Sequence, residues 1–175
     1  MIVTAFAVFA CAASHGASAA DPQLERGKYL VAIGGCSDCH TPGTFLGHAD
    51  EKKFLGGSDV GFSIPGHGVF TGPNLTPDME TGLGKWTAKE IVTAFTMGVR
   101  PDGRVLAPIM PWREFSHLTP SDALAIAAYL KSIPPVANVV PGPFGPSEKP
   151  TVFVMTVLPA DVYAGLPQPE APPAK

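Results

Sequence analysis

The apolar residues of this chain fall into short groups at helical spacing, separated by long stretches rich in glycine and proline. One group follows a capping-box sequence that begins at Thr87, and it predicts a helix to about Met97 that ends at Gly98. A second group follows Thr119-Pro120 and predicts a helix that ends at the proline pair 134–135. The apolar faces of these two helices are predicted to be Ile91, Ala94 and Phe95 in the first, and Ala123, Ile126, Ala127 and Leu130 in the second.

A further helix is predicted over 22–33, because Asp21-Pro22 supplies an N-cap followed by proline at the first helical position. Gly34-Gly35 would end it. Gly27 lies in its middle, where glycine costs about 1 kcal/mol relative to alanine. Close approach of another helix would explain this glycine, and the alanines of 120–132 are small enough to permit it. We therefore predict that these two helices pack tightly at Gly27.

Residues 41–73 contain only short apolar pieces between glycines. The segments 61–65 and 68–71 could form a small hairpin around Gly66-His67, and the rest is predicted to be loop. A stretch of this length without regular structure is uncommon in a compact domain unless it is functional or wraps a large object.

The sequence Cys36-Ser37-Asp38-Cys39-His40 directly follows the helix predicted over 22–33. It matches C-x-x-C-H, the pattern of a c-type haem attachment site. The thiols of Cys36 and Cys39 can form thioethers to the two vinyl groups of one haem, and His40 is then held beneath the iron as an axial ligand. The chain contains no second C-x-x-C-H, so we predict one covalently bound haem c per chain.

Other uses of a cysteine pair at this spacing fit less well. A zinc site would need further ligands, but the chain has no second cysteine pair and no H-x(3–5)-H. A thioredoxin-like dithiol lies in a βαβ context, which we do not find here. A structural disulfide across two residues is uncommon.

Residues 1–20 carry no charge and contain an apolar run followed by small residues, which resembles a secretory signal peptide. The apolar run is too short to span a membrane stably, which favours a cleaved signal peptide. The basic residues that usually begin a signal peptide are missing, and an uncleaved membrane anchor is the alternative. Cleavage is predicted near Ala19, Ala20 or Asp21 and would remove Cys11. The predicted location is therefore the bacterial periplasm or the outer face of the inner membrane.

The formal net charge is −3, and the chain has no basic cluster, which argues against nucleic acid as a partner. No run of 18 apolar residues follows position 20, so the mature chain is not expected to span a membrane. Residues 136–175 are rich in proline and are predicted to form an extended tail that packs partly on the domain or on a partner. We expect disorder after about Leu166.

Met110 is the candidate for the second axial ligand of the iron. It lies between Pro108 and Pro111, outside the predicted helices, and the prolines stiffen the backbone there. Met79 lies in a polar loop and Met97 is displaced from the apolar helix face. From these residues alone, an iron ligand and an ordinary core methionine that fills a gap remain equal alternatives for Met110.

Several aromatic and basic residues are candidates for the surroundings of the haem. Trp86 and Trp112 are expected to be wall residues against the porphyrin rather than redox relays. Arg100 and Arg104 are expected either to neutralise a haem propionate or to lie at the surface. The remaining histidines, His48, His67 and His117, are expected to have no contact with the iron.

The order of these features resembles a class I cytochrome c: a first helix, the haem motif, a later methionine loop and a last helix that crosses the first. Thr71-Gly72-Pro73-Asn74-Leu75 is similar to the family segment whose proline carbonyl accepts a hydrogen bond from the histidine ligand. The resemblance implies an all-α fold with few helices and long loops around one covalently bound haem. It also implies that Met110 binds the iron and that Pro73 orients His40.

A narrower resemblance is to the haem domains in cytochrome subunits of bacterial membrane-bound alcohol and related dehydrogenases. It is carried by Asn74–Asp78, Gly82–Trp86, Pro101–Gly103, Met110-Pro111 and Ala127–Leu130. It covers roughly residues 22–135, so we expect a cytochrome c domain over 21–135 between the signal peptide, 1–20, and the tail, 136–175. Those subunits usually carry several haem domains.

The function that this resemblance implies is transfer of single electrons rather than catalysis. The expected donor is a periplasmic dehydrogenase, with the chain either separate from it or one of its subunits. The expected acceptor is a quinone-linked complex, an oxidase or another cytochrome of the respiratory chain. The alternative is a haem enzyme with an open sixth iron site, of the peroxidase or sulfur-compound oxidase type, and a third class is a haem sensor that moves the tail.

Overall fold

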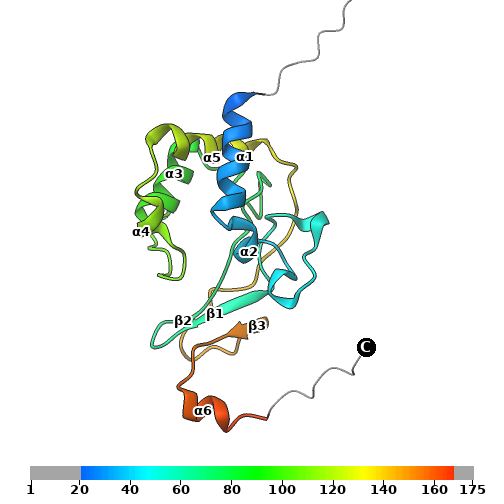
Figure 1. Ribbon diagram of the computed structural model, residues 1–175, viewed down its shortest axis with the longest axis vertical. Coiled ribbons are helices and arrows are strands. Elements are labelled where there is room, and N and C mark those ends of the chain that lie inside the picture. Colours follow the sequence, from blue (N-terminus) through cyan, green and yellow to red (C-terminus); the bar gives the residue numbers. More distant parts are fainter. Residues whose placement is uncertain (1–20, 168–175) are drawn as a thin grey trace, which may run out of the picture.

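The computed structural model describes residues 21–167. Figure 1 shows helices α1, α3, α4 and α5 grouped at one end, the three strands at the other, and α2 between them. The helices are α1 (Pro22–Ile33), α2 (Cys36–His40), α3 (Ala88–Met97), α4 (Trp112–Phe115), α5 (Pro120–Ser132) and α6 (Ala160–Ala164), with 3₁₀ turns at Thr44–Leu46 and Glu51–Lys53. The strands are β1 (Val60–Ile64), β2 (Gly68–Thr71) and β3 (Phe153–Met155).

The three main helices begin and end where their local signals predict. The side chain of Asp21 accepts a hydrogen bond from the Gln23 backbone at the start of α1. Thr87 and Glu90 form both halves of the capping box at α3, and Gly98 ends that helix in the left-handed region. Helix α5 begins with Thr119 as its N-cap. The three predicted helices are confirmed. They were predictable because the residues that start and end each helix lie within a few positions of its ends.

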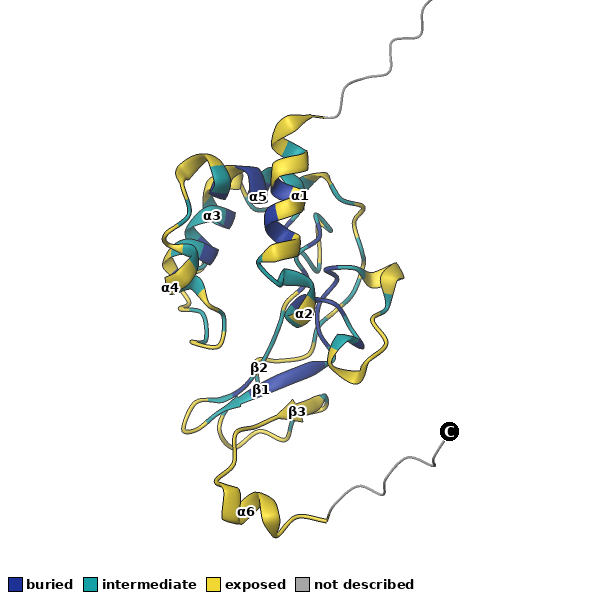
Figure 2. Ribbon diagram, viewed as in Figure 1, coloured by how far each residue is buried: buried dark blue, intermediate teal, exposed yellow. Residues whose placement is uncertain are grey.

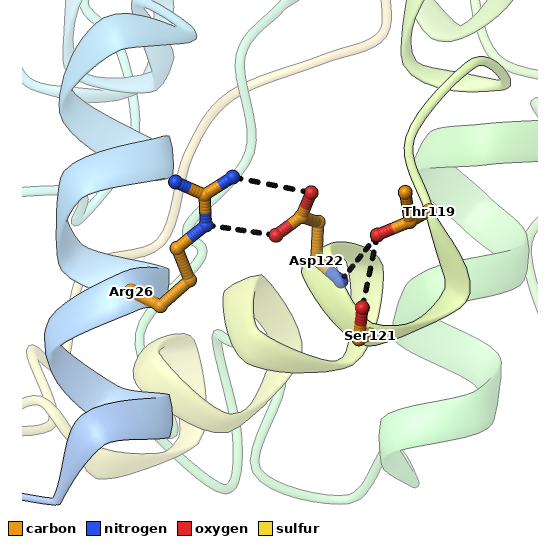
Figure 3. A network of polar contacts seen from close by, with 4 residues as sticks. All are labelled: Arg26, Thr119, Ser121 and Asp122. Carbon is orange, nitrogen blue, oxygen red and sulfur yellow. Dashed lines mark hydrogen bonds and ion pairs between the residues drawn. The ribbon is translucent and has the colours of Figure 1, made fainter.

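Helices α1 and α5 pack closely at Gly27, as predicted. A Cβ atom on Gly27 would overlap the carbonyl oxygen of Ala125 and would lie 2.7 Å from the Cβ of Tyr129. Beside this contact, Arg26 donates two hydrogen bonds to the carboxylate of Asp122, of 2.8 and 3.2 Å (Figure 3). Only glycine at this position allows the two backbones to approach so closely.

The hydrophobic core lies between the helices and continues to the loop that follows α2. Figure 2 shows buried segments on the facing sides of α1, α3 and α5 and along β1, whereas β3 and α6 are exposed. The buried core residues are Leu30, Val31, Leu55, Leu83, Ile91, Phe95, Ala123, Ile126, Ala127 and Leu130. The predicted apolar faces of α3 and α5 therefore supply much of the core.

The expectation of an all-α fold is wrong, because residues 21–167 include a three-stranded sheet with the order β2-β1-β3. The predicted hairpin is present, with β1 and β2 antiparallel and Ser63 opposite Val69. The third strand comes from the tail and runs parallel to β1, with Val60 opposite Phe153. Local patterns identify a hairpin, but a parallel pair between residues more than ninety positions apart depends on where the tail folds back.

The tail packs on the domain before it reaches β3. The Val136 amide donates a 3.0 Å hydrogen bond to the Thr76 hydroxyl, and the Asn138 side chain donates a 2.8 Å bond to the carbonyl of Gly56. The predicted signal peptide and the last residues of the tail, 168–175, lie outside the described residues. Within 21–167, no helix has the length and apolar character needed to cross a membrane.

Candidate haem site

The C-x-x-C-H motif forms a single helical turn, α2, at the end of α1. Gly35 adopts a left-handed conformation, with φ of 64°, and this turns the chain between the two helices. Residues i, i+3 and i+4 of a helix share one face, so Cys36, Cys39 and His40 are presented together. All three line the same cavity.

This cavity has a volume of about 340 Å³ and lies between the helices and the hairpin. The five predicted site residues all line it: Cys36, Cys39, His40, Pro73 and Met110. The structure thus brings together residues that span more than seventy positions of the sequence. Most of the remaining lining is apolar and includes Leu30, Phe62, Phe70, Leu75, Leu83, Ile91, Phe95, Leu106, Phe115, Ile126 and Leu130.

His40 is only 5% exposed, and its Nδ1 lies 2.7 Å from the carbonyl oxygen of Pro73. A carbonyl can only accept, so Nδ1 carries the proton and Nε2 keeps its lone pair. Burial lowers the pKa of His40, against the opposing effect of the hydrogen bond to Pro73. The result is a neutral, oriented imidazole with a nitrogen available to a metal.

The Pro73 carbonyl reaches His40 because the chain passes very close to α2. A Cβ atom on Gly72 would overlap the carbonyl oxygen of Cys39. The amide of Ser58 donates a 2.9 Å hydrogen bond to the carbonyl of Gly72, and the amide of Gly57 donates a 2.8 Å bond to the carbonyl of His40. The backbone of His40 and the backbone next to Pro73 are therefore both hydrogen-bonded to the same two adjacent residues, Gly57 and Ser58.

The two cysteines of the motif are half-buried. Burial raises the pKa of Cys36 to about 11, and it also raises the pKa of Cys39. Redox-active C-x-x-C pairs have a lowered thiol pKa, so the environment disfavours that alternative. Within 21–167, no three or more His, Cys, Asp and Glu side chains are grouped in a way that could hold a metal ion.

Met110 is half-buried and packs against the hydrophobic core at the cavity. The other methionines of the described part of the chain are exposed: Met79 by 56%, Met97 by 64% and Met155 by 42%. None of these three lines the cavity, and neither do His48, His67 and His117. Among residues 21–167, Met110 is thus the methionine that lines the same cavity as the His40 imidazole.

Two arginines and one of the two tryptophans line the cavity. The Arg100 guanidinium lies 5.0 Å from the ring centre of Trp86 and 3.4 Å from the carboxylate of Asp102. Burial, and then repulsion by Arg100, lower the pKa of Arg104. Two neighbouring cations beside an apolar cavity form a setting suited to carboxylates.

The expected wall position of Trp112 is wrong. This residue is not among those that line the cavity, and its ring packs against Gly98, where a Cβ atom would lie 2.7 Å from two ring carbons. Gly98 ends α3 in the left-handed region, and its open surface accommodates the indole. The sequence around Trp112 does not indicate that its ring contacts Gly98.

Sequence reasoning also missed part of the cavity wall. Phe62 and Phe70 line it from the hairpin, and the tail contributes Val140, Pro141, Gly142 and Pro143. The tail lies far along the chain from the motif, and no local signal points to this position. The tail is therefore not an appendage separate from the site.

The residues present fit a covalently bound haem c. An apolar cavity lined by two thiols, a neutral imidazole with Nε2 available and a methionine thioether could supply the attachment points and the donors that such a haem needs. The pair Arg100 and Arg104 suits the propionate groups.

Comparisons with known proteins agree with this site. The family model described as "Cytochrome c" matches residues 24–134. The chain is 31% identical over 126 residues to the cytochrome c subunit of a quinone alcohol dehydrogenase from Gluconobacter oxydans, which covers 71% of this chain and 24% of that protein. It is 36% identical over 118 residues to a nicotinate dehydrogenase subunit from Pseudomonas putida, covering 67% of this chain and 9% of that protein.

A third relative is the fructose dehydrogenase cytochrome subunit from Gluconobacter japonicus, at 33% identity over 114 residues, with 65% of this chain and 22% of that protein covered. The match thus spans about a quarter or less of the length of these relatives. The family match covers most of the described residues and includes all five candidate site residues. The chain therefore belongs to the cytochrome c family, whose members are electron-transfer proteins that bind haem c covalently.

Proposed function

We propose that the chain binds one haem c and carries single electrons between a periplasmic dehydrogenase and the respiratory chain. The observation that carries the proposal is the hydrogen bond from His40 to Pro73 inside a cavity that is also lined by Met110. The single C-x-x-C-H motif supports one haem per chain.

Each site residue has a role in this proposal. Cys36 and Cys39 would hold the vinyl groups through thioethers, and His40 through Nε2 and Met110 through its sulfur would fill both axial positions. Pro73 keeps the imidazole in the tautomer and orientation that this requires. The haem, when bound, supplies the one-electron couple between ferric and ferrous iron.

The surroundings of the cavity would raise the reduction potential. An apolar wall disfavours the additional positive charge of the ferric state. The positive charges of Arg100 and Arg104 act in the same direction wherever the propionates do not neutralise them. A methionine ligand raises the potential further, which suits a protein that accepts electrons from a dehydrogenase.

The proposed donor rests on the relatives, which are named as subunits of quinone alcohol, nicotinate and fructose dehydrogenases. We propose that the chain serves such a dehydrogenase, as a subunit or as a separate carrier. The acceptor would be a quinone-linked complex, an oxidase or another cytochrome. The uncharged apolar start of the sequence supports export to the periplasm or the outer face of the inner membrane.

Absorption and EPR spectra of the purified ferric protein test the proposed ligation. We expect a low-spin haem with the near-infrared charge-transfer band of methionine–iron ligation, because both axial positions are filled. Met110→Ala should abolish the band and lower the reduction potential, whereas Met97→Ala, at an exposed methionine, should leave both unchanged.

A high-spin spectrum of the unmodified protein would contradict this proposal and favour a haem enzyme with an open sixth site. Loss of the band in Met97→Ala but not in Met110→Ala would contradict the ligand assignment.

A further inference from the structure

The first part of the tail, residues 136–144, connects α5 to the sheet, and Val140–Pro143 within it line the cavity; we call this segment the strap. It begins just after α5 and leads toward β3 (Figure 1). Over residues 136–140 exposure alternates, with Val136, Asn138 and Val140 half-buried and Ala137 and Val139 exposed, and residues 141–143 are exposed where they line the cavity. An extended segment with this alternation turns one row of side chains inward and the other to solvent.

A buried polar network fixes the start of the strap. The side-chain amide of Asn74, which is 2% exposed, donates a 2.7 Å hydrogen bond to the carbonyl of Val136. The oxygen of the same amide accepts bonds from the backbone and the hydroxyl of Thr76, of 2.9 and 2.7 Å. Asn74 directly follows Pro73, the acceptor for His40, so the strap is tied to the residue next to that acceptor.

Further contacts hold the strap along its length. The hydroxyl of Thr71 donates a hydrogen bond to the carbonyl of Pro141. Val69 and Phe144 exchange two backbone hydrogen bonds of 2.9 Å, one in each direction. The strap is therefore bonded at both ends and near its middle to the segment 69–76, which contains Pro73.

Val140 contacts the segment that holds the backbone of His40. A Cβ atom on Gly57 would overlap a methyl group of Val140. The amide of Gly57 donates a hydrogen bond to the carbonyl of His40, so Val140 packs against a residue that is bonded directly to the histidine backbone. Val140 and the three residues after it also line the cavity itself.

We propose that the strap is part of the haem-binding site: Val140–Pro143 form a wall against the haem, and the strap positions the Pro73 carbonyl that orients His40. The inference rests on the proposed function, since it assumes that the cavity holds haem. The strap excludes water from this side of the haem and from the hydrogen bond between His40 and Pro73. A drier site disfavours the ferric charge, so the strap raises the reduction potential.

Neighbouring valines provide a matched test, because Val140 lines the cavity whereas Val139 is 80% exposed. The experiment uses the full chain carrying its haem, with attachment verified by intact mass. In proton NMR of the diamagnetic ferrous protein, ring current from the porphyrin should shift the methyl signals of Val140 out of the usual valine range. The signals of Val139 should stay within that range, and Val140→Ala and Val139→Ala identify which signals belong to each residue.

The reduction potentials of the same two variants give a second measurement. We expect a lower potential for Val140→Ala, because the opened wall admits water, and an unchanged potential for Val139→Ala. Unshifted Val140 methyl signals in protein that carries haem would overturn the strap proposal and leave the proposed function standing, as would equal potentials for the two variants. Protein without attached haem would overturn the proposed function, and the strap proposal with it.

Discussion

The helical end of the molecule and the segments around His40 are held together by different kinds of interaction. Helices α1, α3 and α5 begin and end at local caps and pack through small and apolar side chains. The segments around His40 are joined by hydrogen bonds between side chains and backbone groups far apart in the sequence, such as Asn74 to Val136 and Asn138 to Gly56. Packing between helices therefore holds the helical end together, whereas specific polar bonds hold the segments around His40.

The largest effect is expected where the polar bonds are most buried. Asn74→Ala removes the shortest hydrogen bond to the Val136 carbonyl, of 2.7 Å, and the acceptor of both the amide and the hydroxyl of Thr76, so it should lower the free energy of unfolding by about 3 kcal/mol. Urea denaturation measures this loss. Asn138→Ala is the matched control, because it removes one bond, to the Gly56 carbonyl, and should cost about 1 kcal/mol. Equal losses for the two variants would contradict the special weight given to Asn74.

The crossing of α1 and α5 is expected to be nearly as sensitive, for a different reason. Gly27→Ala would improve helix propensity by about 1 kcal/mol, yet its Cβ would overlap the Ala125 carbonyl. Separation of the helices should therefore give a net destabilisation of about 2 kcal/mol in urea. Lys28→Ala, at the adjacent exposed position, should change stability by less than about 0.5 kcal/mol. A stabilised Gly27→Ala variant would show that the two helices can separate without loss.

A local cap should matter less than either contact between distant residues. Thr87→Ala removes the hydrogen bond from the Glu90 amide to the Thr87 hydroxyl at the start of α3, while the backbone amide of residue 87 can still donate to the Glu90 carboxylate, and it should cost about 1 kcal/mol. Thr93→Ala, in the middle of the same helix, is the control, since alanine has the higher helix propensity there. Thermal denaturation measures the stability of both variants. If Thr87→Ala lost as much stability as Asn74→Ala, the contrast between the two ends of the molecule would not hold.

The smallest effect is expected for the ion pair at the surface of the α1–α5 crossing. The hydrogen bond from Arg26 is the main cause that lowers the pKa of Asp122 in the folded protein. Stability from this pair is therefore present at neutral pH and is lost as the pH falls below about 4 through the folded pKa. The stability difference between the unmodified protein and Asp122→Asn should shrink toward zero over that range in urea titrations. A difference that stays constant from pH 7 to pH 3 would contradict this origin.

The same contrast explains what could be predicted from the sequence. The three helices were predictable because Asp21, Thr87 and Thr119 mark their starts locally. The haem motif was identifiable by its spacing, whereas Met110 was singled out as the iron ligand only through the family resemblance, and both line the same cavity. The third strand was missed, because β3 depends on β1 from a distant part of the chain, and so the all-α expectation was wrong.

The position of the strap was beyond prediction for a similar reason. Its register depends on Asn74, Thr71 and Val69, each of which reads locally as part of a loop or a short strand. The contact of Trp112 with Gly98 likewise depends on how α4 folds back on α3. Relations of this kind exist only in the folded chain.

The proposed site requires that Cys36 and Cys39 hold one haem covalently in this cavity. The most direct test is the intact mass of the mature chain, produced by export in a host that matures c-type cytochromes and then extracted with acid–acetone. We expect the mass of the polypeptide plus one haem, and the bare polypeptide mass for the variant with Cys36→Ala and Cys39→Ala. An unmodified chain with the mass of the polypeptide alone would contradict covalent attachment and the function built on it.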